Sequence, residues 1–377
     1  MKILVAPDKF KGSLNAIQVC EAISEGIQQV APDIEIIQCP LADGGEGTAE
    51  ILTYHTQGKT ITKEVNDPLM RPVEASFGIS GDGTTAFIEM AVASGLYLLK
   101  PEERNCLYTT TYGTGELILE ALHRGVRKII LGIGGSATND CGMGMAVALG
   151  YQFLDKNGKQ LEPIGENLQY VAEIDDSGLK FDPEALEVNI ACDVDNPLYG
   201  ENGAAWIYGP QKGADDEAIE VLDQGLREIN EVFQRQYGMD ANTIPGAGAA
   251  GGLGAGGVIF LNASLLPGVQ LVMEQVNFQE MVEGVDLIIT GEGKIDQQTI
   301  RGKAVKGVSE VGQQHHIPVA ALCGTFDGSI DLIRQLNLVF AASIINKPET
   351  FEEAIQHTHT GLKNLAFSLV RLYAWAG

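Results

Sequence analysis

Apolar and polar residues alternate at the beginning of the chain in the pattern of a parallel β-sheet with helices between its strands. Residues 2–6 form a short apolar run, and 15–30 repeat apolar positions at helical spacing. Residues 34–39 predict a second strand, and a glycine-rich loop at 43–47 leads into another helix. This order is typical of a parallel sheet whose ligand-binding loops lie at the strand ends.

The middle of the chain has a different pattern. Three short alternating segments, 60–65, 73–78 and 85–90, are separated by turns and predict antiparallel strands. A second α/β region follows, with helices predicted at 115–123, 138–149 and 215–236 and strands at 128–131 and 151–154.

Near its end the chain returns to the parallel pattern, with strands predicted at 286–290, 318–323 and 338–342 and a closing helix at 351–373. Because both ends share one rhythm, we expect them to build one domain into which the middle is inserted. The expected fold is α/β with two domains. Residues 1–58 and 285–377 would form a Rossmann-like parallel-sheet domain, and 59–284 an inserted α/β domain with antiparallel strands and glycine-rich loops. We expect the active site in the cleft between them.

The composition predicts a globular protein with an acidic surface. Of the 377 residues, 45% are hydrophobic and 20% are charged, which is enough apolar material for a sizeable core. The 25 Lys and Arg against 50 Asp and Glu give a net charge of −25, which repels nucleic acid. An anionic substrate would then need positive groups or metal concentrated locally.

The sequence predicts neither export nor membrane insertion. The apolar opening meets Asp8 and Lys9 too early for a signal peptide, and no apolar stretch approaches the roughly 20 residues that span a bilayer. The six cysteines contain no C-x-x-C pair, which argues against a zinc site or a disulfide framework. We therefore expect a cytoplasmic protein.

Acidic side chains end four of the predicted strands. In the first, Asp8 precedes Lys9 and Lys11, which could hold an anionic group. A solvated loop that caps the next helix at Ser13 or Asn15 is the ordinary alternative.

The second strand end places Asp43 beside Gly44 and Gly45. Because glycine has no side chain, its backbone N–H can approach a ligand closely. A tight turn in which Asp43 caps the helix is the alternative.

Two later strand ends repeat this chemistry. Asp193 and Asp195 follow an apolar strand, with Lys212 shortly after, and Glu292 and Asp296 lie in a glycine-containing segment. Such acids can bind Mg²⁺ or accept a hydroxyl proton, although an Asx turn is the alternative at the first pair. Four such strand ends in one chain favour a shared site.

A glycine-rich segment at 132–137, GIGGSA, fits the dinucleotide-binding pattern G-x-G-x-x-A. Asp155 ends the next predicted strand and would then be the ribose-binding acid. An NAD-dependent dehydrogenase of a small hydroxy acid is therefore an alternative. Against it, Thr138, Asn139 and Asp140 put polar groups at the helix start, which suits phosphate or substrate better than a close-packed cofactor helix.

A second glycine tract, 246–257, has the spacing G-x-G-x-x-G without a clear preceding strand. A nucleotide-phosphate or substrate loop and a close-packed backbone or hinge are equally compatible with it. The sequence contains no G-x-x-x-x-G-K-[ST], which excludes a Walker-type kinase, and no G-x-S-x-G hydrolase elbow.

In series, these segments resemble the bacterial glycerate kinase family of glyoxylate and sugar-acid catabolism. The resemblance covers almost the whole chain, through APDKFKGSL, PLADGGEGT, YGTGELI, GIGGSATND, ACDVDNPLYG, GPQKGA, PGAGAAGGLG and ITGEGKID in that order. The chain departs from the family at Cys141, where the family's TNDGGMG run would have glycine.

The resemblance implies two α/β domains and an enzyme that uses ATP with Mg²⁺ to phosphorylate D-glycerate, with 2-phosphoglycerate favoured over 3-phosphoglycerate. A non-catalytic sugar-acid sensor stays open beside the dehydrogenase. Expected partners are D-glycerate and ATP, with no nucleic acid and no membrane, and the chain would be a monomer or homodimer. Which glycine-rich loop holds ATP and which holds glycerate stays open.

Phosphoryl transfer depends mainly on positioning and charge neutralisation, so we look for a base, cations and metal ligands. We assign Asp193 as the base toward the glycerate hydroxyl, with Lys11 and Lys212 as neutralising catalytic cations. Candidate metal ligands are Asp195, Glu292 and Asp296. The candidate substrate- or nucleotide-binding residues are Asp8, Lys9, Ser13, Asp43, Gly44, Gly45, Gly134, Gly135, Ser136, Thr138, Asn139, Asp140, Gly251 and Gly252.

Overall fold

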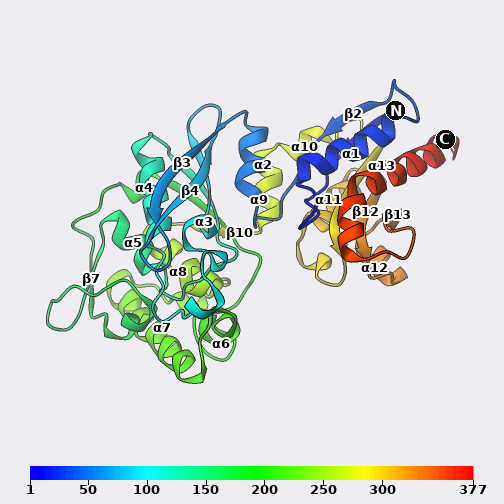
Figure 1. Cartoon of the computed structure of the whole chain (residues 1–377). Helices are drawn as coiled ribbons and strands as arrows, with labels where there is room; N and C mark the ends of the chain where they lie inside the picture. Colours follow the sequence, from blue (N-terminus) through cyan, green and yellow to red (C-terminus); the bar gives the residue numbers. More distant parts are fainter. Residues whose placement is uncertain (377) are drawn as a thin grey trace. The chain divides into compact units, whose positions relative to one another are not determined.

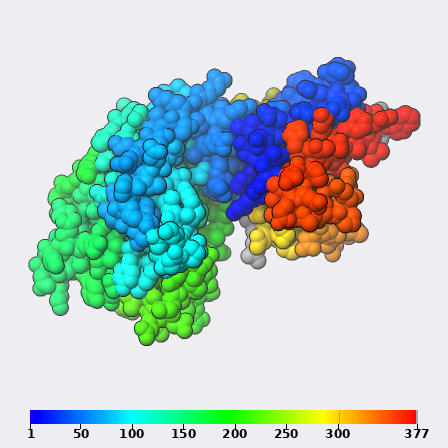
Figure 2. Space-filling model, viewed as in Figure 1, coloured from blue at the N-terminus to red at the C-terminus, as the bar shows by residue number. Residues whose placement is uncertain are grey.

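The computed structural model describes residues 1–376, which form two compact α/β units (Figure 1). Unit 1 comprises Met1–Asp43 and the chain from Gly268 onward, and unit 2 comprises Gly44–Pro267. In Figure 2 the blue surface of the first segment adjoins the orange and red surface of the last one, as a unit built from both segments requires. The α/β fold class expected from the sequence is confirmed.

The boundaries between the units differ from those expected after residue 58 and before residue 285. Helix α2 (Thr48–His55) packs on the unit 2 strands β4 (Pro72–Ile79) and β5 (Thr85–Glu89), so the first boundary falls before this helix. Helix α9 (Gly268–Gln275) packs on α10 (Phe278–Met281) and α11 (Ala304–Gln314) of unit 1, so the second boundary falls before α9. Each helix belongs to the sheet or helices that it covers, and the change in sequence pattern alone did not reveal this.

Unit 1 is built on a five-stranded parallel sheet with the order β13-β12-β11-β1-β2. Its strands are β1 (Lys2–Val5), β2 (Glu35–Gln38), β11 (Leu287–Ile295), β12 (Val319–Phe326) and β13 (Phe340–Ser343). The chain adds β2 on one side of β1 and then adds β11, β12 and β13 on the other side. The direction of winding therefore reverses between β1 and β11, which is a topological switch point.

The helices of unit 1 bury the apolar strands of this sheet. Helix α1 (Ala16–Gln28) packs against α13 (Phe351–Ala376), and their apolar faces meet Ile3, Val5 and Ile289. Asn15 begins α1 with a capping box, as one of the sequence alternatives predicted. The remaining helices are α10 (Phe278–Met281), α11 (Ala304–Gln314), which packs on β11 and β12, and α12 (Ile330–Gln335).

Unit 2 is built on a six-stranded mixed sheet with the order β10-β9-β6-β5-β4-β3. Its strands are β3 (Lys59–Asn66), β4 (Pro72–Ile79), β5 (Thr85–Glu89), β6 (Lys128–Gly132), β9 (Glu187–Ala191) and β10 (Ser264–Leu266). The predicted antiparallel pairing is confirmed for β3 with β4 and for β4 with β5, whereas β5, β6, β9 and β10 are parallel. The carboxyl ends of these four strands therefore share one edge of the sheet.

The helices of unit 2 cover this sheet and build a second apolar cluster. They are α2, α3 (Ala91–Ser94), α4 (Tyr112–His123), α5 (Met143–Leu149), α6 (Ala204–Tyr208), α7 (Asp216–Tyr237) and α8 (Ala249–Leu261). Strands β7 (Gln152–Leu154) and β8 (Glu173–Asp175) form a separate antiparallel pair. Within residues 1–376, none of the helices is both long and apolar enough to cross a membrane.

The glycine tract at 246–257 lies mostly in α8, whose helical conformation is interrupted at Ala250, Gly251 and Gly252. All three have positive φ, and the Gly251 carbonyl accepts a hydrogen bond from the Cys141 N–H at 3.1 Å. A Cβ at Gly251 would collide with the carbonyl oxygen of Thr138. The tract is thus a close-packed backbone contact, as one of its two sequence interpretations predicted.

We predict that Gly251→Ala destabilises unit 2 by about 3 kcal/mol, because the new methyl group meets a backbone carbonyl and the backbone must keep a positive φ. A loss of this size lowers the Tm by roughly 6–12 °C in a unit of this length. Gly158→Ala is the matched control, since Gly158 has φ +76° and open space around its Cα. Calorimetry showing equal Tm values for the two variants would contradict the close-packing explanation.

Candidate active site

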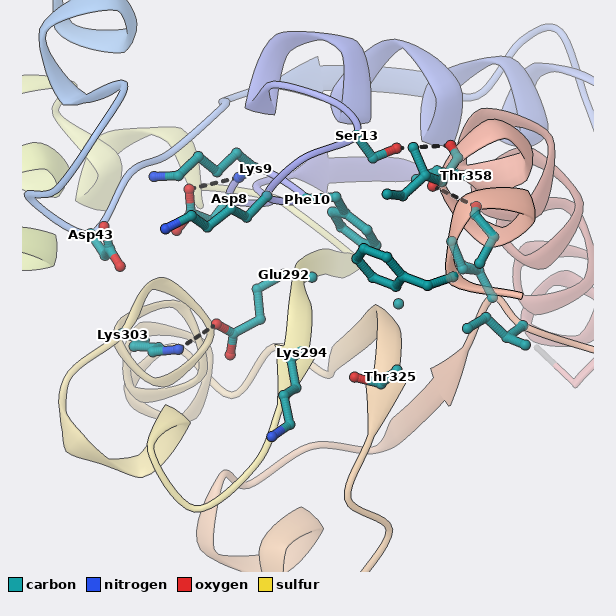
Figure 3. A pocket seen from close by; sticks show the side chains of 18 residues that line it. Asp8, Lys9, Phe10, Ser13, Asp43, Glu292, Lys294, Lys303, Thr325 and Thr358 are labelled. Atoms are coloured by element: carbon teal, nitrogen blue, oxygen red, sulfur yellow. Dashed lines mark hydrogen bonds and ion pairs between the residues drawn. The ribbon is translucent and has the colours of Figure 1, made fainter. Parts of the chain in front are cut away.

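A pocket of about 400 Å³ opens in unit 1 beyond the carboxyl ends of its parallel strands (Figure 3). Its lining includes residues from the loop after β1, from β11 and β12, from the segment after β13 and from the first turns of α13. It brings together six of the residues singled out from the sequence: Asp8, Lys9, Lys11, Ser13, Asp43 and Glu292. In Figure 3, Asp8, Asp43, Glu292 and Lys303 lie on one side of the pocket, and Ser13 and Thr358 lie on the other.

Asp8 is placed by an extension of the pairing between β1 and β11. Its backbone N–H donates to the carbonyl oxygen of Gly291 at 2.8 Å, and its carboxylate accepts from the Lys9 N–H at 2.6 Å. The residue is 6% exposed. Burial, with a smaller contribution from Asp43, raises the pKa of Asp8 to about 7, although Lys9 acts in the opposite direction. The charged form of Asp8 is therefore disfavoured unless a cation lies close to its carboxylate.

Glu292 lies beside it on β11 and is also buried. Thr299 donates its hydroxyl to one carboxylate oxygen at 2.6 Å, and the Lys303 ammonium lies 3.4 Å from the other. Burial nevertheless raises the pKa of Glu292 above its ordinary value. Lys303, which follows β11 in the sequence, is thus the ion-pair partner of Glu292.

The three candidate metal ligands lie in different surroundings. Glu292 lines the pocket, whereas Asp296 pairs with Lys294 at 2.9 Å, which lowers the pKa of Asp296. Asp195 lies in unit 2, exposed on the loop after β9. Among residues 1–376, no three His, Cys, Asp or Glu side chains form a group able to hold a metal ion by themselves. These three residues therefore do not form a protein cage.

The carboxylates of the pocket nevertheless fit Mg²⁺ that arrives with a ligand. Mg²⁺ in phosphoryl-transfer sites is usually held by one or two carboxylates, by substrate phosphates and by water. Hard oxygen atoms of this kind are offered by Asp8, Asp43 and Glu292. The charges of Asp43 and Glu292 both raise the pKa of Asp8, so the three carboxylates lie close enough to interact.

In unit 2, two glycine-rich loops meet near the carboxyl ends of the parallel strands. A Cβ on Gly132 would lie 2.9 Å from the Gly44 carbonyl oxygen, and one on Gly134 would lie 3.9 Å from Gly45 Cα. At the end of β5, Glu89 accepts a hydrogen bond from the backbone N–H of Ala49 at 2.9 Å, in the first turn of α2. The structure therefore brings together the loops at 44–47 and 132–136, which the sequence identified separately.

Lys212 holds the second of these loops from inside the protein. It is 2% exposed, and its ammonium donates to the Ser136 hydroxyl and to the Thr138 carbonyl oxygen, each at 2.7 Å. Burial lowers the pKa of Lys212 to about 8. The sequence assigned Lys212 as a cation that neutralises a ligand, whereas its visible contacts position the loop at 134–138.

Asp140 also has internal contacts. It is completely buried and accepts hydrogen bonds from the N–H and hydroxyl of Thr111 at 2.8 and 2.7 Å and from the N–H groups of Gly142 and Gly144 at 3.2 and 3.0 Å. Burial raises its pKa, although all four donors act in the opposite direction. These bonds keep the loop out of the helix, so α5 begins at Met143 and not at the predicted residue 138.

The two neighbours of Asp140 in this loop, Asn139 and Cys141, are also buried. Cys141 has φ +53°, a conformation that favours glycine, and this explains why a glycine was expected there. Asn139 is fully buried, and neither polar atom of its side-chain amide has a hydrogen-bond partner among the described residues. Sequence reasoning missed Thr111, although the run Thr109-Thr110-Thr111 before a helix was a visible signal.

Asp193 and Asp195 follow β9, which is the parallel neighbour of β6. The register pairs Gly132 with Ala191, so the loop of Asp193 and the loop of Ser136 leave the same edge of the sheet. Both aspartates are exposed. The structure therefore places the proposed base on a surface loop beside the glycine-rich loop.

The dinucleotide-binding interpretation is wrong. It required Asp155 at the end of a parallel strand next to β6, but β6 pairs with β5 and β9. Asp155 instead follows β7, which pairs antiparallel with β8, and its carboxylate accepts from the N–H groups of Asn157 and Lys159 in a turn. Spacing alone could not distinguish these two topologies.

A doubly wound parallel sheet with lysines and buried carboxylates at its strand ends is typical of an α/β enzyme that acts on anionic small molecules. A comparison with protein families gives a more specific result. The model of the glycerate kinase family matches residues 3–374. The chain belongs to the glycerate kinase family and is therefore a kinase.

Individual relatives agree with this assignment. A protein of Halalkalibacterium halodurans named glycerate kinase is 45% identical over 375 residues, which cover 99% of this chain and 98% of the relative. A protein of Escherichia coli K12 named glycerate 2-kinase is 44% identical over 373 residues, with 98% of each chain covered. A crystal structure described as glycerate kinase 2 from Salmonella typhimurium LT2 has a TM-score of 0.92 at 42% identity and covers 100% of this chain and 99% of its own.

The buried ammonium of Lys212 predicts a specific dependence of stability on pH. Its pKa is about 8 in the folded protein against an ordinary 10.5, so the unfolded chain keeps the proton to higher pH. Folded-state stability should therefore rise between about pH 8 and about pH 10.5, by roughly 3 kcal/mol in total. Relative to Lys212→Met, the Tm of the wild type should increase over this range in differential scanning fluorimetry.

Lys180→Met is the matched control for this measurement. Lys180 is exposed, and its ammonium also donates to a backbone carbonyl oxygen, that of Ala148 at 2.9 Å. The Tm of this variant should follow the wild type in parallel across the pH series. Parallel curves for Lys212→Met as well would show that burial does not disfavour the charged form of Lys212.

Proposed function

We propose that this kinase transfers the terminal phosphoryl group of ATP to D-glycerate and forms 2-phosphoglycerate. The observation that carries this proposal is the strand-end pocket in which lysines and buried carboxylates converge, because phosphoryl transfer requires charge neutralisation more than covalent chemistry. The names of the relatives support glycerate as the acceptor, and the name of the Escherichia coli relative supports its 2-hydroxyl group.

The reaction needs one bond made, one bond broken and one proton moved. The glycerate hydroxyl oxygen bonds to the terminal phosphorus of ATP, the bond from that phosphorus to the bridging oxygen breaks, and ADP leaves with the electron pair. We assign the hydroxyl proton to Asp193, which is exposed and follows a strand end. Lys9, Lys11 and Lys303 line the pocket and would offset the charge of the phosphates.

Mg²⁺, when bound with ATP, would lower the negative charge of the phosphates. We propose Asp8, Asp43 and Glu292 as the residues that hold it, in place of the set Asp195, Glu292 and Asp296 inferred from the sequence. The support is that these carboxylates share one pocket, whereas Asp296 is paired with Lys294.

We also propose that the reaction takes place in the cytoplasm, where ATP is available. The described cysteines are all free, which is consistent with a reducing compartment. The small-molecule partners would be D-glycerate and ATP. A monomer or homodimer, and a site shared by the two units, stay predictions.

The position of phosphorylation can be read directly from the product. Phosphorus on the 2-oxygen couples to one methine proton, whereas phosphorus on the 3-oxygen couples to two methylene protons. We expect the phosphomonoester signal of the product formed from D-glycerate and ATP to be a doublet in a ³¹P spectrum recorded without proton decoupling. A triplet-like signal would establish 3-phosphoglycerate and would contradict the proposed position while leaving the kinase assignment intact.

We predict that Asp193→Asn lowers kcat by about 10²- to 10⁴-fold, because an amide cannot accept the hydroxyl proton, while glycerate binding changes little. A coupled assay of ADP release gives kcat and KM. Glu201→Gln is the control, since Glu201 is another exposed acid farther along the same loop region. If both variants keep the kcat of the wild type, Asp193 is not the base.

A further inference from the structure

We propose that the pocket of unit 1 is the nucleotide site, with the base of ATP at its apolar side and the polyphosphate at its charged side. This inference rests on the proposed function, because it assigns one of the two substrates of that reaction to one place. Neither the family match nor the names of the relatives assigns either substrate to a place in the chain.

The first support is the position of the pocket in the sheet. In open α/β sheets, ligands bind beyond the carboxyl ends of the strands at the point where the winding reverses. Here that point lies between β1 and β11, in the order β13-β12-β11-β1-β2. Asp8 follows β1 and Glu292 lies in β11, so the buried carboxylates of the pocket stand at the switch point itself.

The second support is the chemistry of the charged side. Lys9, Lys11 and Lys303 line the pocket together with the carboxylates. Lys303 is also the N-cap residue of α11, and its side chain makes no capping hydrogen bond to the helix N-terminus. First-turn N–H groups of a helix have no partner within the helix and favour an anion. Lysines, a helix N-terminus and carboxylates suited to a divalent cation match a polyphosphate carried with Mg²⁺.

The third support is the chemistry of the opposite side. Phe10, Ile344, Ile345, Phe351 and Ile355 line it. Phe351 is 73% exposed, although it is a large aromatic residue at the first position of α13. A planar base that stacks on an exposed ring removes apolar surface from water. In Figure 3 the ring of Phe10 lies between the charged group and the residues from α13, so one ligand must contact both kinds of surface to fill the pocket.

The floor of the pocket is made of backbone. Gly293 on β11 and Gly324 on β12 lie side by side, and a Cβ on Gly324 would come within 2.6 Å of the Gly293 carbonyl oxygen. Neither position carries a side chain into the cavity, so an extended ligand can lie across the strands.

The same features exclude glycerate as the ligand that fits this pocket best. Glycerate bears a polar group on each of its three carbons and has no apolar ring for the aromatic side to contact. The volume of about 400 Å³ is within the range for sites that hold drug-sized ligands. An adenine nucleotide matches both the size and the division into apolar and charged sides.

The test is isothermal titration of the full-length protein with MgADP and, separately, with magnesium tripolyphosphate as a probe that lacks base and ribose. We expect Phe351→Ala to weaken MgADP binding about tenfold through lost stacking and to leave tripolyphosphate binding unchanged. Lys303→Ala should weaken the binding of both. The matched control is Trp375→Ala, which removes an aromatic residue that is 90% exposed near the other end of the same helix.

Three outcomes overturn the inference: an unchanged MgADP affinity in Phe351→Ala, an equal loss in Trp375→Ala, or an equal loss of both probes in Phe351→Ala. Because Phe351 is exposed, we expect an unchanged Tm, and this is measured alongside. In the kinetic assay, Phe351→Ala should raise the KM for ATP and not the KM for glycerate. If the wild type binds MgADP in this way but does not phosphorylate glycerate, the proposed function fails and the nucleotide site stands.

Discussion

The parallel pairing of β1 with β11 is the constraint on which unit 1 depends. It joins Ile3 to Leu287 and continues beyond the strand, where the Ala6 N–H donates to Ile289 and the Asp8 N–H donates to Gly291, both at 2.8 Å. Parallel strands need a crossover connection, and here the crossover contains the whole of unit 2. Because of this pairing, Asp8 and Glu292 stand at neighbouring strand ends although they are far apart in sequence.

Burial then decides what these charged groups can do. A buried carboxylate loses hydration and must gain hydrogen bonds or a cation in exchange. Asp140 accepts hydrogen bonds from the N–H groups of Gly142 and Gly144 in its own loop and from the N–H and hydroxyl of Thr111, so it stabilises the backbone at 138–144. Asp8 accepts a hydrogen bond from the Lys9 N–H, and the nearby carboxylates of Asp43 and Glu292 raise the pKa of Asp8. Asp140 therefore has its hydrogen-bond partners within unit 2, whereas the surroundings of Asp8 fit its proposed role of holding a cation.

The sequence predicted the regular parts of the fold well, because local periodicity determines them. Apolar runs at 128–131 and 318–323 and helical spacing at 215–236 correspond to β6, β12 and α7. It failed where tertiary contacts override local pattern. The helix expected from residue 138 begins at Met143, because Asp140 binds Thr111, which lies 29 positions earlier in the chain.

The candidate site shows the same division between local and tertiary information. Acids, lysines and glycines at strand ends could be recognised from their types, and Asp8, Lys9, Lys11, Ser13, Asp43 and Glu292 line one pocket. Lys212 has the right residue type, but its burial and its hydrogen bonds to Ser136 and Thr138 depend on the packing of distant segments. The sequence did not mark Phe351 as a site residue, because an aromatic residue at a helix start usually belongs to the core. The structure shows it exposed and lining the pocket.

The acidity of the chain makes the composition of this pocket informative. With a net charge of −25, the long-range field repels a nucleotide polyphosphate, so binding requires short-range compensation. Lys9, Lys11 and Lys303 provide part of it, but the adjacent carboxylates Asp8, Asp43 and Glu292 cancel much of that positive charge at close range. With these carboxylates beside them, the lysines leave little net positive charge to attract metal-free ATP. When the phosphates carry a divalent cation, the same carboxylates favour binding, because their oxygen atoms can coordinate that cation. In the nucleotide site proposed above, this composition would favour a metal-bound nucleotide over a metal-free one by electrostatics.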